Sequence, residues 1–504
     1  MTDNPNRARI SRTKNFLTNN RKRQAIRINI GKANEYFVGS KSKNNPDLDT
    51  ELPKRIEMIA FNNVNLVPMT GEKVFDNQTV FVDDTKIIEI GPVNEVVIPE
   101  KAEIIDGEGA YLMPGLADMH VHILRDKWPV SQLKLYLANG VTTIRSLGTT
   151  ADEKDHTAVV DWSNQINEGE KIGPNICATC PPITGSETNP WKLVSRYDKE
   201  GYNCVKLFSP LSKTDFIRTI KTAKERNILT VGHIPTNVAL DGALLEGMNE
   251  IAHIKELVLE LIDFDRNKRF RENETLPFVA KAFSEQYNFS NFNDTDFQKD
   301  IRRKVSSIVN ELKFKNISVH TTLFIFEDVD IRIFKGNGEF LQRPENKYLP
   351  KEAFRVLSQG NDWLIGYVKE FKEFWRFLLE VQKIFLIELN NAGVPLILGT
   401  DAGIGILGIV PGFCVHEELR VLTESGFTPY QAIATGTVNA SKAVAAMNGR
   451  DDFGTIGVGK RADFILVNKN PLENVGNVKD NRGVMAAGRW YSKSGLQEMI
   501  ALND

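Results

Sequence analysis

The alternation of strand-like and helix-like segments through the middle of this chain constrains its fold more than any other feature. Short apolar runs rich in β-branched residues alternate there with longer segments of helical periodicity. Such alternation favours a parallel sheet with helical crossovers. Eight units of this kind make a (β/α)8 barrel, so we predict an α/β fold containing a TIM barrel. The strand-like runs are residues 113–122, 141–146, 175–179, 203–208, 228–233, 250–253, 317–323 and 394–401.

Both ends of the chain have a different sequence pattern, in which short strand-like runs are separated by Gly, Asn and Asp turns. We predict that residues 56–110 and 453–495 form one small composite β-sandwich beside a barrel spanning 111–452. A charged helical segment at about 256–315 interrupts the barrel pattern after its sixth strand. This insertion is expected to be a lid, a peripheral decoration or an oligomer contact, and the sequence leaves these three open.

Composition excludes several classes of protein. The 504 residues carry a net charge of 63 − 65 = −2, which gives no global bias towards nucleic acid or anionic membranes. No apolar run approaches the ~20 residues of a membrane span, and no secretory signal is visible, so a cytoplasmic protein is expected. Four cysteines suit a reducing compartment, and Cys177 and Cys180 are interpreted as buried residues rather than a redox pair.

Residues 1–55 form a basic arm with 13 basic and 5 acidic residues. Such an arm can bind nucleic acid or acidic surfaces. Its apolar residues are scattered and it has no aromatic stacking pattern, which favours a solvated, flexible extension instead.

The residues suited to metal chemistry collect at the predicted strand ends. His120 and His122 are two apart on one strand, so both imidazoles project to the same side, although two unrelated histidines on a polar face would look alike. In a TIM barrel the active site lies at the carboxyl ends of the strands. Four of the chain's seven histidines fall at such ends, which predicts a metal site. Read in chain order, the strand-end residues are His120, His122, Lys206, His233, His253 and Asp401.

Motifs along the chain resemble the amidohydrolase superfamily of metal-dependent hydrolases, and more closely its imidazolonepropionase-like and Xaa-Pro dipeptidase-like branch. The resemblance covers about residues 56–491 and implies a hydrolase acting on carbon–nitrogen bonds. The motifs are Pro114–His122, Val205–Leu207, Gly232 with His233, Ile251–His253, Leu398–Gly403, His416–Leu419, Gly426–Pro429 and Gly457–Asp463.

The resemblance also implies a role for each strand-end residue. His120 and His122 would bind the more buried of two divalent ions, with Asp401 as a further ligand, and His233 and His253 would bind the second. Lys206 matches the lysine that is N-carboxylated in binuclear members and bridges the ions. Zinc suits this His-rich set, although manganese, iron and cobalt are not excluded.

Catalysis would then use a metal-activated water, with Asp401 as the residue that takes and returns its proton. His320, at the end of the seventh strand, is either a catalytic donor to the developing oxyanion or a structural residue, and both interpretations stay open. We expect His156 to be solvated in a polar helix, and His416 to orient neighbours or cap a helix.

Mononuclear deaminases of the superfamily that the chain resembles typically have a Glu shortly after the histidine of the fifth strand. No acidic residue follows His233 in positions 234–237, so the resemblance, together with Lys206, argues against deamination. The leading interpretation is hydrolysis of an amide or peptide-like C–N bond in a small molecule, with no nucleic-acid or membrane partner and with a homo-oligomer left open. A lactone, ester or phosphotriester hydrolase is the alternative enzyme, and a non-catalytic binding or scaffold protein is the alternative of another class. A dipeptide-like substrate would need a cation for its carboxylate, for which Arg145, Lys192 and Arg196 are candidates.

Overall fold

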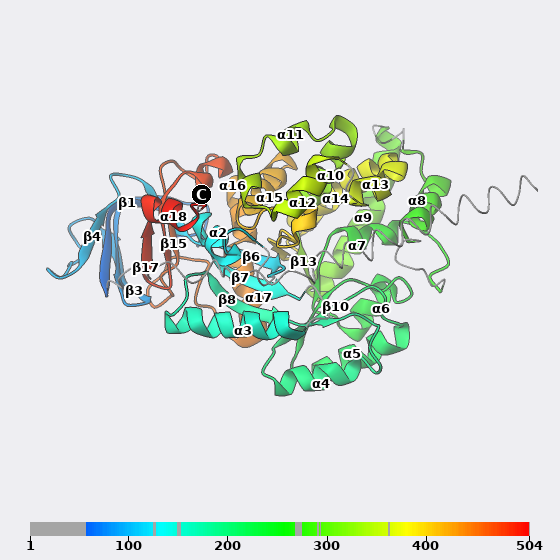
Figure 1. Cartoon of the computed structure of the whole chain (residues 1–504), viewed down its shortest axis with the longest axis horizontal. Coiled ribbons are helices and arrows are strands. Elements are labelled where there is room, and N and C mark those ends of the chain that lie inside the picture. The colour runs from blue at the N-terminus through cyan, green and yellow to red at the C-terminus, as the bar shows by residue number, and fades with distance from the viewer. Residues whose placement is uncertain are drawn as a thin grey trace, which may run out of the picture.

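The computed structural model describes residues 57–123, 128–148, 153–267, 275–289, 292, 294–360 and 363–502. A strand-rich unit lies at one end of the molecule, and a larger body of strands and helices forms the rest (Figure 1). The basic arm lies outside the described residues. None of the described helices combines the length and the apolar character that a membrane span requires.

The strand-rich unit is one sheet built from both ends of the chain. β1 lies near its middle, pairs antiparallel with β2 and parallel with β4 and β5, and β5 in turn pairs antiparallel with β15. A sheet of eight strands is described, so the second layer that a sandwich needs stays a prediction. The strands in order are β17 (Arg489–Ser492), β16 (Asn481–Ala486), β15 (Phe464–Val467), β5 (Tyr111–Pro114), β1 (Met58–Leu66), β2 (Phe75–Asp83) and β3 (Lys86–Pro92), with β4 (Glu103–Asp106) beside β1.

The chain passes from this sheet into the barrel across a single residue, Gly115. A side chain at this position would collide with Thr142, because an added Cβ would lie 2.1 Å from the Thr142 hydroxyl. The predicted barrel start at residue 111 therefore falls within the sheet, since β5 pairs with β1 and β15 before β6 begins. The rest of the predicted domain division stays a prediction.

Parallel strands form the barrel-like part. β6 (Leu116–Val121), β7 (Val141–Leu147) and β8 (Asn175–Cys180) make one sheet, and the strands from β9 to β14 make another. The second sheet contains β9 (Pro182–Ile183), β10 (Cys204–Leu207), β11 (Leu229–Gly232), β12 (Glu250–Ile251), β13 (Ser318–His320) and β14 (Leu396–Ile397). Each predicted strand-like run of the middle region overlaps at least one of these strands, as a TIM-barrel-like fold requires.

The two sheets join at both ends. Pro181 separates β8 from β9, because proline has no backbone N–H to donate to a neighbouring strand. Its carbonyl still accepts a hydrogen bond from the Lys206 amide at 2.9 Å, so β8 and β9 together form the third predicted strand. On the other side, the Met119 amide donates to the Leu398 carbonyl at 2.9 Å, and Val121 pairs in parallel with Ala402. The ring of strands is thereby closed around the β6 end, where the histidine pair lies.

Helices follow the barrel strands, and their ends obey local rules. The Ser212 hydroxyl accepts an amide at the start of α5, and Asp294 does the same for α9, while Asn316 and Gly393 end α9 and α14 in the left-handed conformation. The main helices are α2 (Gln132–Ala138), α3 (Glu153–Glu168), α4 (Trp191–Lys199), α5 (Lys213–Glu225), α6 (Ala239–Glu246), α7 (Lys255–Val258), α8 (Thr275–Gln286), α9 (Thr295–Lys315), α10 (Phe324–Lys335), α11 (Gly338–Leu341), α12 (Lys351–Ser358), α13 (Trp363–Val368), α14 (Lys372–Ala392), α15 (Phe413–Glu424), α16 (Pro429–Thr435), α17 (Val438–Asn448) and α18 (Lys493–Met499).

The long helical stretches of the sequence are divided more finely than predicted. The 256–315 insertion contains α7, α8 and α9, with a short 3-10 helix at Leu259–Leu261, and its role stays open. Between β13 and α12 the sequence analysis missed α10 and α11. The apolar face of α14 packs against α9 and α10, and the resulting core includes Phe283, Phe374 and Phe377.

The cysteines differ from the prediction. Cys180 and Cys204 lie on neighbouring strands β8 and β10 with their Cα atoms 4.8 Å apart, and they form a disulfide. Cys177 is half-buried and unpaired. The four-cysteine count gave no sign of this bond, because the pairing depends on strand register and the two residues are 24 apart in sequence.

Candidate metal centre

The carboxyl end of β6 and the loop after β14 bring two imidazoles onto one carboxylate. His120 Nε2 lies 3.1 Å from Asp401 Oδ1, and His122 Nε2 lies 2.7 Å from the same oxygen. One possible ligand atom of each residue lies within 4.8 Å of the other two. The i, i+2 spacing on β6 and the return of the chain after β14 thus create the donor cluster expected from the sequence.

Backbone contacts fix the loop that carries Asp401. The Asp401 amide donates to the His120 carbonyl at 2.8 Å, and the His122 amide donates to the Ala402 carbonyl at 2.7 Å. These bonds hold Asp401 at φ 61°, a left-handed conformation that is unfavourable for a residue with a side chain. Gly403 has φ 110°, and an added Cβ there would lie 1.7 Å from the His122 carbonyl oxygen. Only glycine fits this close approach.

Three neighbouring strands supply the other predicted ligands. Lys206 is on β10, His233 follows β11 and His253 follows β12. The Lys206 Nζ lies 3.2 Å from His120 Nε2. The His253 ring centre is 4.7 Å from that of His120 and 4.9 Å from that of His233. All six predicted ligand residues therefore gather in one place, and metal binding by them stays a prediction.

Hydrogen bonds fix the rings of His233 and His253 from behind. His233 Nδ1 lies 2.9 Å from Glu256 Oε1, and the other oxygen of Glu256 accepts the Ile234 amide at 3.1 Å. His253 Nδ1 lies 3.0 Å from the Thr322 hydroxyl. Each ring consequently has its Nε2 atom turned away from these partners, which is the arrangement in which a histidine ligates a metal through Nε2.

The β6 histidines differ from each other. His120 Nδ1 lies 3.1 Å from the Ala252 carbonyl, so this ring is also fixed from behind. His122 Nδ1 is buried and has no hydrogen-bond partner in the described part of the chain, while its Nε2 faces Asp401. The His122 ring is therefore hydrogen-bonded only on its Asp401 side. A cation between His122 Nε2 and the Asp401 carboxylate would be a partner for both groups.

Burial sets the protonation of the cluster. Burial, with the charge of Lys206 next in effect, lowers the pKa of His120 well below its usual value, and burial also lowers the pKa of His233 and His253. Burial alone would raise the pKa of Asp401, but His120 and His253 bring it well below its usual value. Burial lowers the pKa of the Lys206 amine to about 7. Neutral imidazoles, an ionised carboxylate and a readily neutralised amine form a donor set that fits divalent metals.

His320 and Arg145 do not have the positions expected for substrate contacts. Both side chains are fully buried inside the barrel, and both nitrogens of the His320 ring contact protein groups. Arg145 pairs with the buried carboxylate of Glu250, which removes it as a candidate for a substrate carboxylate. The catalytic role of His320 stays a prediction, but the structure places it behind His120 rather than facing an open site.

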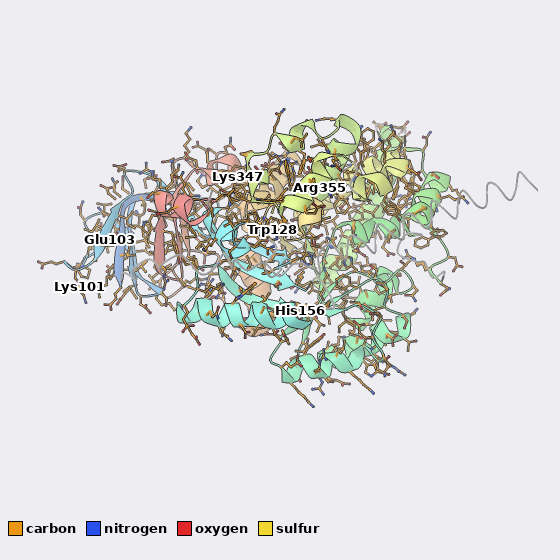
Figure 2. All side chains as sticks on the ribbon, in the orientation of Figure 1. Lys101, Glu103, Trp128, His156, Lys347 and Arg355 are labelled. Carbon is orange, nitrogen blue, oxygen red and sulfur yellow. A yellow bond between two sulfur atoms is a disulfide. The ribbon has the colours of Figure 1, made fainter. Side chains whose placement is uncertain are left out.

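Three further residues differ from the sequence picture or complete it. His156 lies on α3 (Figure 2) and is buried, not solvated. Its ring lies against Gly148, where an added Cβ would be 2.6 Å from the ring. His416 is buried on α15, in keeping with an orienting role. Glu256, which the sequence analysis did not place in the site, lies at the start of α7 and is buried against His233. The sequence shows only that Glu256 follows His253 by three residues. Its contact with His233, 23 residues earlier, depends on the strands β11 and β12 lying side by side.

Comparison with known proteins bears on this cluster. Residues 367–491 match the model of the amidohydrolase family, a range that includes Asp401. An adenine deaminase of Staphylothermus marinus is 33% identical over 100 residues, covering 19% of this chain and 16% of the relative. An imidazolonepropionase of Shewanella oneidensis is 32% identical over 126 residues, covering 24% and 28%. A solved putative prolidase from Bifidobacterium longum covers 89% of this chain and 100% of its own, with a TM-score of 0.59 at 20% identity.

The sequence match to the amidohydrolase family thus covers the C-terminal part of the chain. The structural likeness concerns the fold, and it extends over nearly all of the described residues. The curated relatives, in contrast, are matched over less than a third of their own lengths. The family typically uses a divalent metal, and the cluster of His120, His122 and Asp401 is a group that can hold one.

Proposed function

We propose that this protein is a metal-dependent hydrolase of the amidohydrolase family that cleaves an amide or peptide-like C–N bond in a small substrate. The observation that carries the proposal is the convergence of two imidazoles, one carboxylate and one buried lysine at the strand ends. The environment holds the His120 imidazole neutral and the Asp401 carboxylate ionised, which are the ligating forms. Two divalent ions, zinc by preference for nitrogen-rich donors, would be held by His120, His122 and Asp401 and by His233 and His253.

Bound divalent ions would supply a lowered pKa for water and polarisation of the substrate carbonyl. Asp401 is the residue of this chain that moves the proton. Its side chain is 18% exposed, whereas that of His120 is fully buried, so Asp401 faces the side from which substrate can approach. It takes a proton from the attacking water and returns it to the leaving amine.

Lys206 is proposed to be N-carboxylated. The amine is buried beside His120 Nε2, and an ammonium there would repel divalent ions strongly in this interior. Addition of carbon dioxide to the neutral amine forms an N–C bond and releases one proton. The product is an anionic group with two oxygen donors, which can bridge the two ligand sets.

Hydrolysis of a C–N bond is favoured over deamination by the position of the nearest acid. Glu256 contacts the Nδ1 side of His233 and the Ile234 amide, so it orients the ring and does not face the Nε2 side. The relatives named above include an adenine deaminase as well as an imidazolonepropionase, so the preference against deamination rests on the position of Glu256 and not on these names. Lactone, ester or phosphotriester hydrolysis on the same residues is the alternative, and substrate identity depends on the loops after the strands.

Metal content of the purified protein tests the proposal. We expect about two divalent ions per chain in the presence of bicarbonate, a sharp fall in Lys206→Ala, and no change in the exposed control Lys221→Ala. About one ion in both wild type and Lys206→Ala would contradict the bridging lysine. No metal in the wild type would contradict the proposed function and favour a binding or scaffold protein.

Activity is then screened with dipeptides, N-acyl amino acids, lactones and phosphotriesters. We expect turnover of a C–N substrate and a loss of about 10²–10⁴-fold in Asp401→Asn, as for removal of a proton-transferring group. Turnover confined to lactones or phosphotriesters would establish the alternative reaction class.

A further inference from the structure

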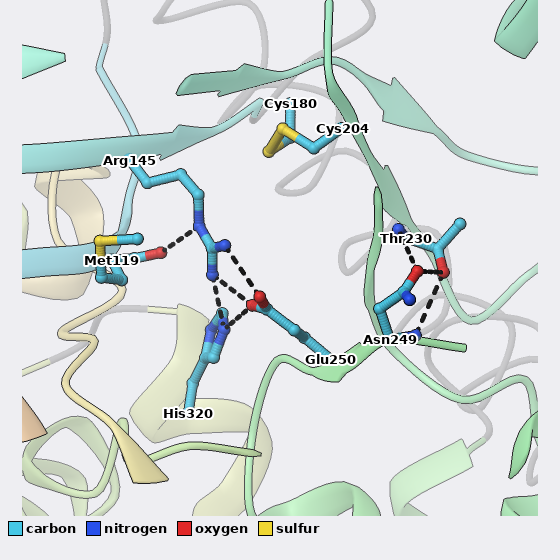
Figure 3. Close-up of a disulfide and its surroundings, with 8 residues drawn as sticks. All are labelled: Met119, Arg145, Cys180, Cys204, Thr230, Asn249, Glu250 and His320. Carbon is cyan, nitrogen blue, oxygen red and sulfur yellow. Dashed lines mark hydrogen bonds and ion pairs between the residues drawn. A yellow bond between two sulfur atoms is a disulfide. The ribbon is translucent and has the colours of Figure 1, made fainter. Parts of the chain in front are cut away.

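A charged group that the proposed reaction does not use lies inside the barrel, directly behind His120. It consists of Arg145 on β7, Glu250 on β12 and His320 on β13, and all three side chains are buried. Figure 3 shows the carboxylate of Glu250 and the ring of His320 facing the guanidinium of Arg145, near the Cys180–Cys204 disulfide. Buried charges of this kind are expensive unless each is paired, so the group requires an explanation.

Each member of the group has a defined contact. Arg145 Nη1 and Nη2 lie 3.2 and 2.5 Å from the two carboxylate oxygens of Glu250, and its Nε donates to the Met119 carbonyl at 3.1 Å. His320 Nε2 lies 3.0 Å from Glu250 Oε2 and 2.9 Å from Arg145 Nη2. His320 Nδ1 lies 3.1 Å from His120 Nδ1. The contacts form a continuous chain from the Arg145–Glu250 pair to His120.

The protons in this chain can be placed from groups that accept hydrogen bonds and cannot donate them. The Ala252 carbonyl at His120 Nδ1 (3.1 Å) can only accept, whereas His120 Nε2 has a donor beside it, Lys206 Nζ at 3.2 Å, as well as the acceptor Asp401 Oδ1 at 3.1 Å. We therefore place the proton of a neutral His120 on Nδ1. His320 Nδ1 then faces an N–H and must act as an acceptor, which leaves the His320 proton on Nε2. That proton points to the Glu250 carboxylate, which also accepts but does not donate. Arg145 Nη2, which can only donate, also lies 2.9 Å from His320 Nε2, but its shorter contact is with Glu250 Oε2 at 2.5 Å, so we direct its hydrogen bond to that oxygen. With this assignment, one arrangement satisfies both ends of the chain.

We propose that Arg145, Glu250 and His320 are positioning residues that fix the tautomer and the ring orientation of His120. Glu250 holds the His320 proton on Nε2, the bare His320 Nδ1 accepts from His120 Nδ1–H, and His120 Nε2 is left as a lone pair facing Asp401. Arg145 balances the carboxylate charge and anchors it to the backbone of β6. The inference rests on the proposed function in one respect: the lone pair of His120 Nε2 has a role because His120 is proposed to bind a metal through that atom.

A matched pair of His320 substitutions tests the network. His320→Asn can place its Oδ1 near the former Nδ1 and still accept from His120, whereas His320→Phe keeps a ring and removes the acceptor. Each protein is stripped with chelator, and its affinity for Zn²⁺ is measured by competition with a chromophoric chelator. We expect a loss of about 10–100-fold for the Phe variant, the range for removal of a group that orients a ligand, and less than about 3-fold for the Asn variant. The control Phe340→Leu changes a buried residue in a separate core cluster and should leave the affinity unchanged.

Equal affinities of the Phe variant and wild type would overturn the inference. Equal losses in the Asn and Phe variants would also overturn it, because the acceptor would then be irrelevant. A second measurement does not need metal. Nitrogen-15 chemical shifts of histidine-labelled, metal-free wild type, assigned with the His320→Asn variant, should show the proton of His120 on Nδ1 and that of His320 on Nε2.

The opposite tautomer on either ring would refute the network, even if the wild type proved to bind no metal and the proposed function failed. The tautomer measurement also decides the inference should the Phe variant not fold. Weak metal binding in the Phe variant, with the expected tautomers in the wild type, would support both the inference and the proposed function.

Discussion

Breaking the Arg145–Glu250 pair should be among the most destabilising single changes available in this protein. The guanidinium is fully buried and the carboxylate is nearly so, and they meet through two hydrogen bonds. Glu250→Gln leaves Arg145 with an uncompensated charge, and Arg145→Met does the same to Glu250. Removal of one partner of a buried pair typically costs about 3–5 kcal/mol of unfolding free energy. The double variant buries no charge in this group, so its cost should fall below the sum of the single costs by about 1–3 kcal/mol.

The pH dependence of the unfolding free energy gives a second value for what the Arg145–Glu250 pair contributes to stability. Burial alone would raise the pKa of Glu250, but the charge of Arg145 and the His320 hydrogen bond lower it from 4.5 to about 2. A pKa lowered from 4.5 to about 2 corresponds to a stabilisation of about 3 kcal/mol. Because the folded-state pKa is the lower one, this stabilisation is present above pH 4.5 and is lost as the pH falls towards 2. The difference in unfolding free energy between wild type and Glu250→Gln should therefore become smaller as the pH falls from 4.5 towards 2.

Urea unfolding of chelator-treated protein, followed by tryptophan fluorescence, measures these differences without a contribution from bound metal. A suitable control is Arg303→Met, which removes an exposed ion pair with Asp300 and should cost about 0–1 kcal/mol. The reasoning is refuted if Glu250→Gln and Arg145→Met each cost less than about 1 kcal/mol, since buried pairs cost several times more to break. Strict additivity in the double variant would also refute it, because it would show that the two side chains do not interact.

Three further changes test how the ligand rings are held. Gly403→Ala should lower both thermal stability and Zn²⁺ affinity, because its Cβ would overlap the His122 carbonyl, and a fully active variant would contradict the close approach. Thr322→Val removes the partner of His253 Nδ1 and should weaken metal binding about 10-fold or more, whereas Thr423→Val on α15 should not. Glu256→Gln replaces an obligate acceptor beside His233 and should weaken metal binding about 10–100-fold, and an unchanged affinity would exclude an orienting role for Glu256.

The positions of the proposed ligands were predictable because they follow from strand periodicity and barrel geometry. His120 and His122 share one side of β6, and residues that follow other parallel strands lie at the same end of the barrel. The family motifs made the same assignment. The groups behind the ligands were not predictable, because each comes from a strand or loop far away in sequence. Thr322, for example, is 69 residues from His253 and becomes its neighbour only through the pairing of β12 with β13.

The charged residues inside the barrel illustrate a different limit. Arg145 was predicted as a possible substrate contact because a dipeptide-like substrate would need a cation for its carboxylate. In the structure it is instead buried beside a carboxylate of the protein. Its partner Glu250 begins a strand of only two residues, and nothing in the local sequence indicates that this carboxylate points inward. Likewise, Cys180 and Cys204 become neighbours through the register of β8, β9 and β10, which residue spacing does not encode.

The proposed ligands differ in how they are held, and this difference constrains the direction of catalysis. On the closed side, His120 is fully buried and connects to a paired charge network on three strands. On the open side, Asp401 and His233 retain 18% and 14% of their side-chain exposure, and Asp401 is fixed by a strained loop backbone. Under the proposed function, a substrate would therefore approach over Asp401 and His233. Asp401, which is proposed to carry the proton, is thus on the side that the substrate would meet first. His120, the ligand whose ring is held by the buried charge network, is fully buried.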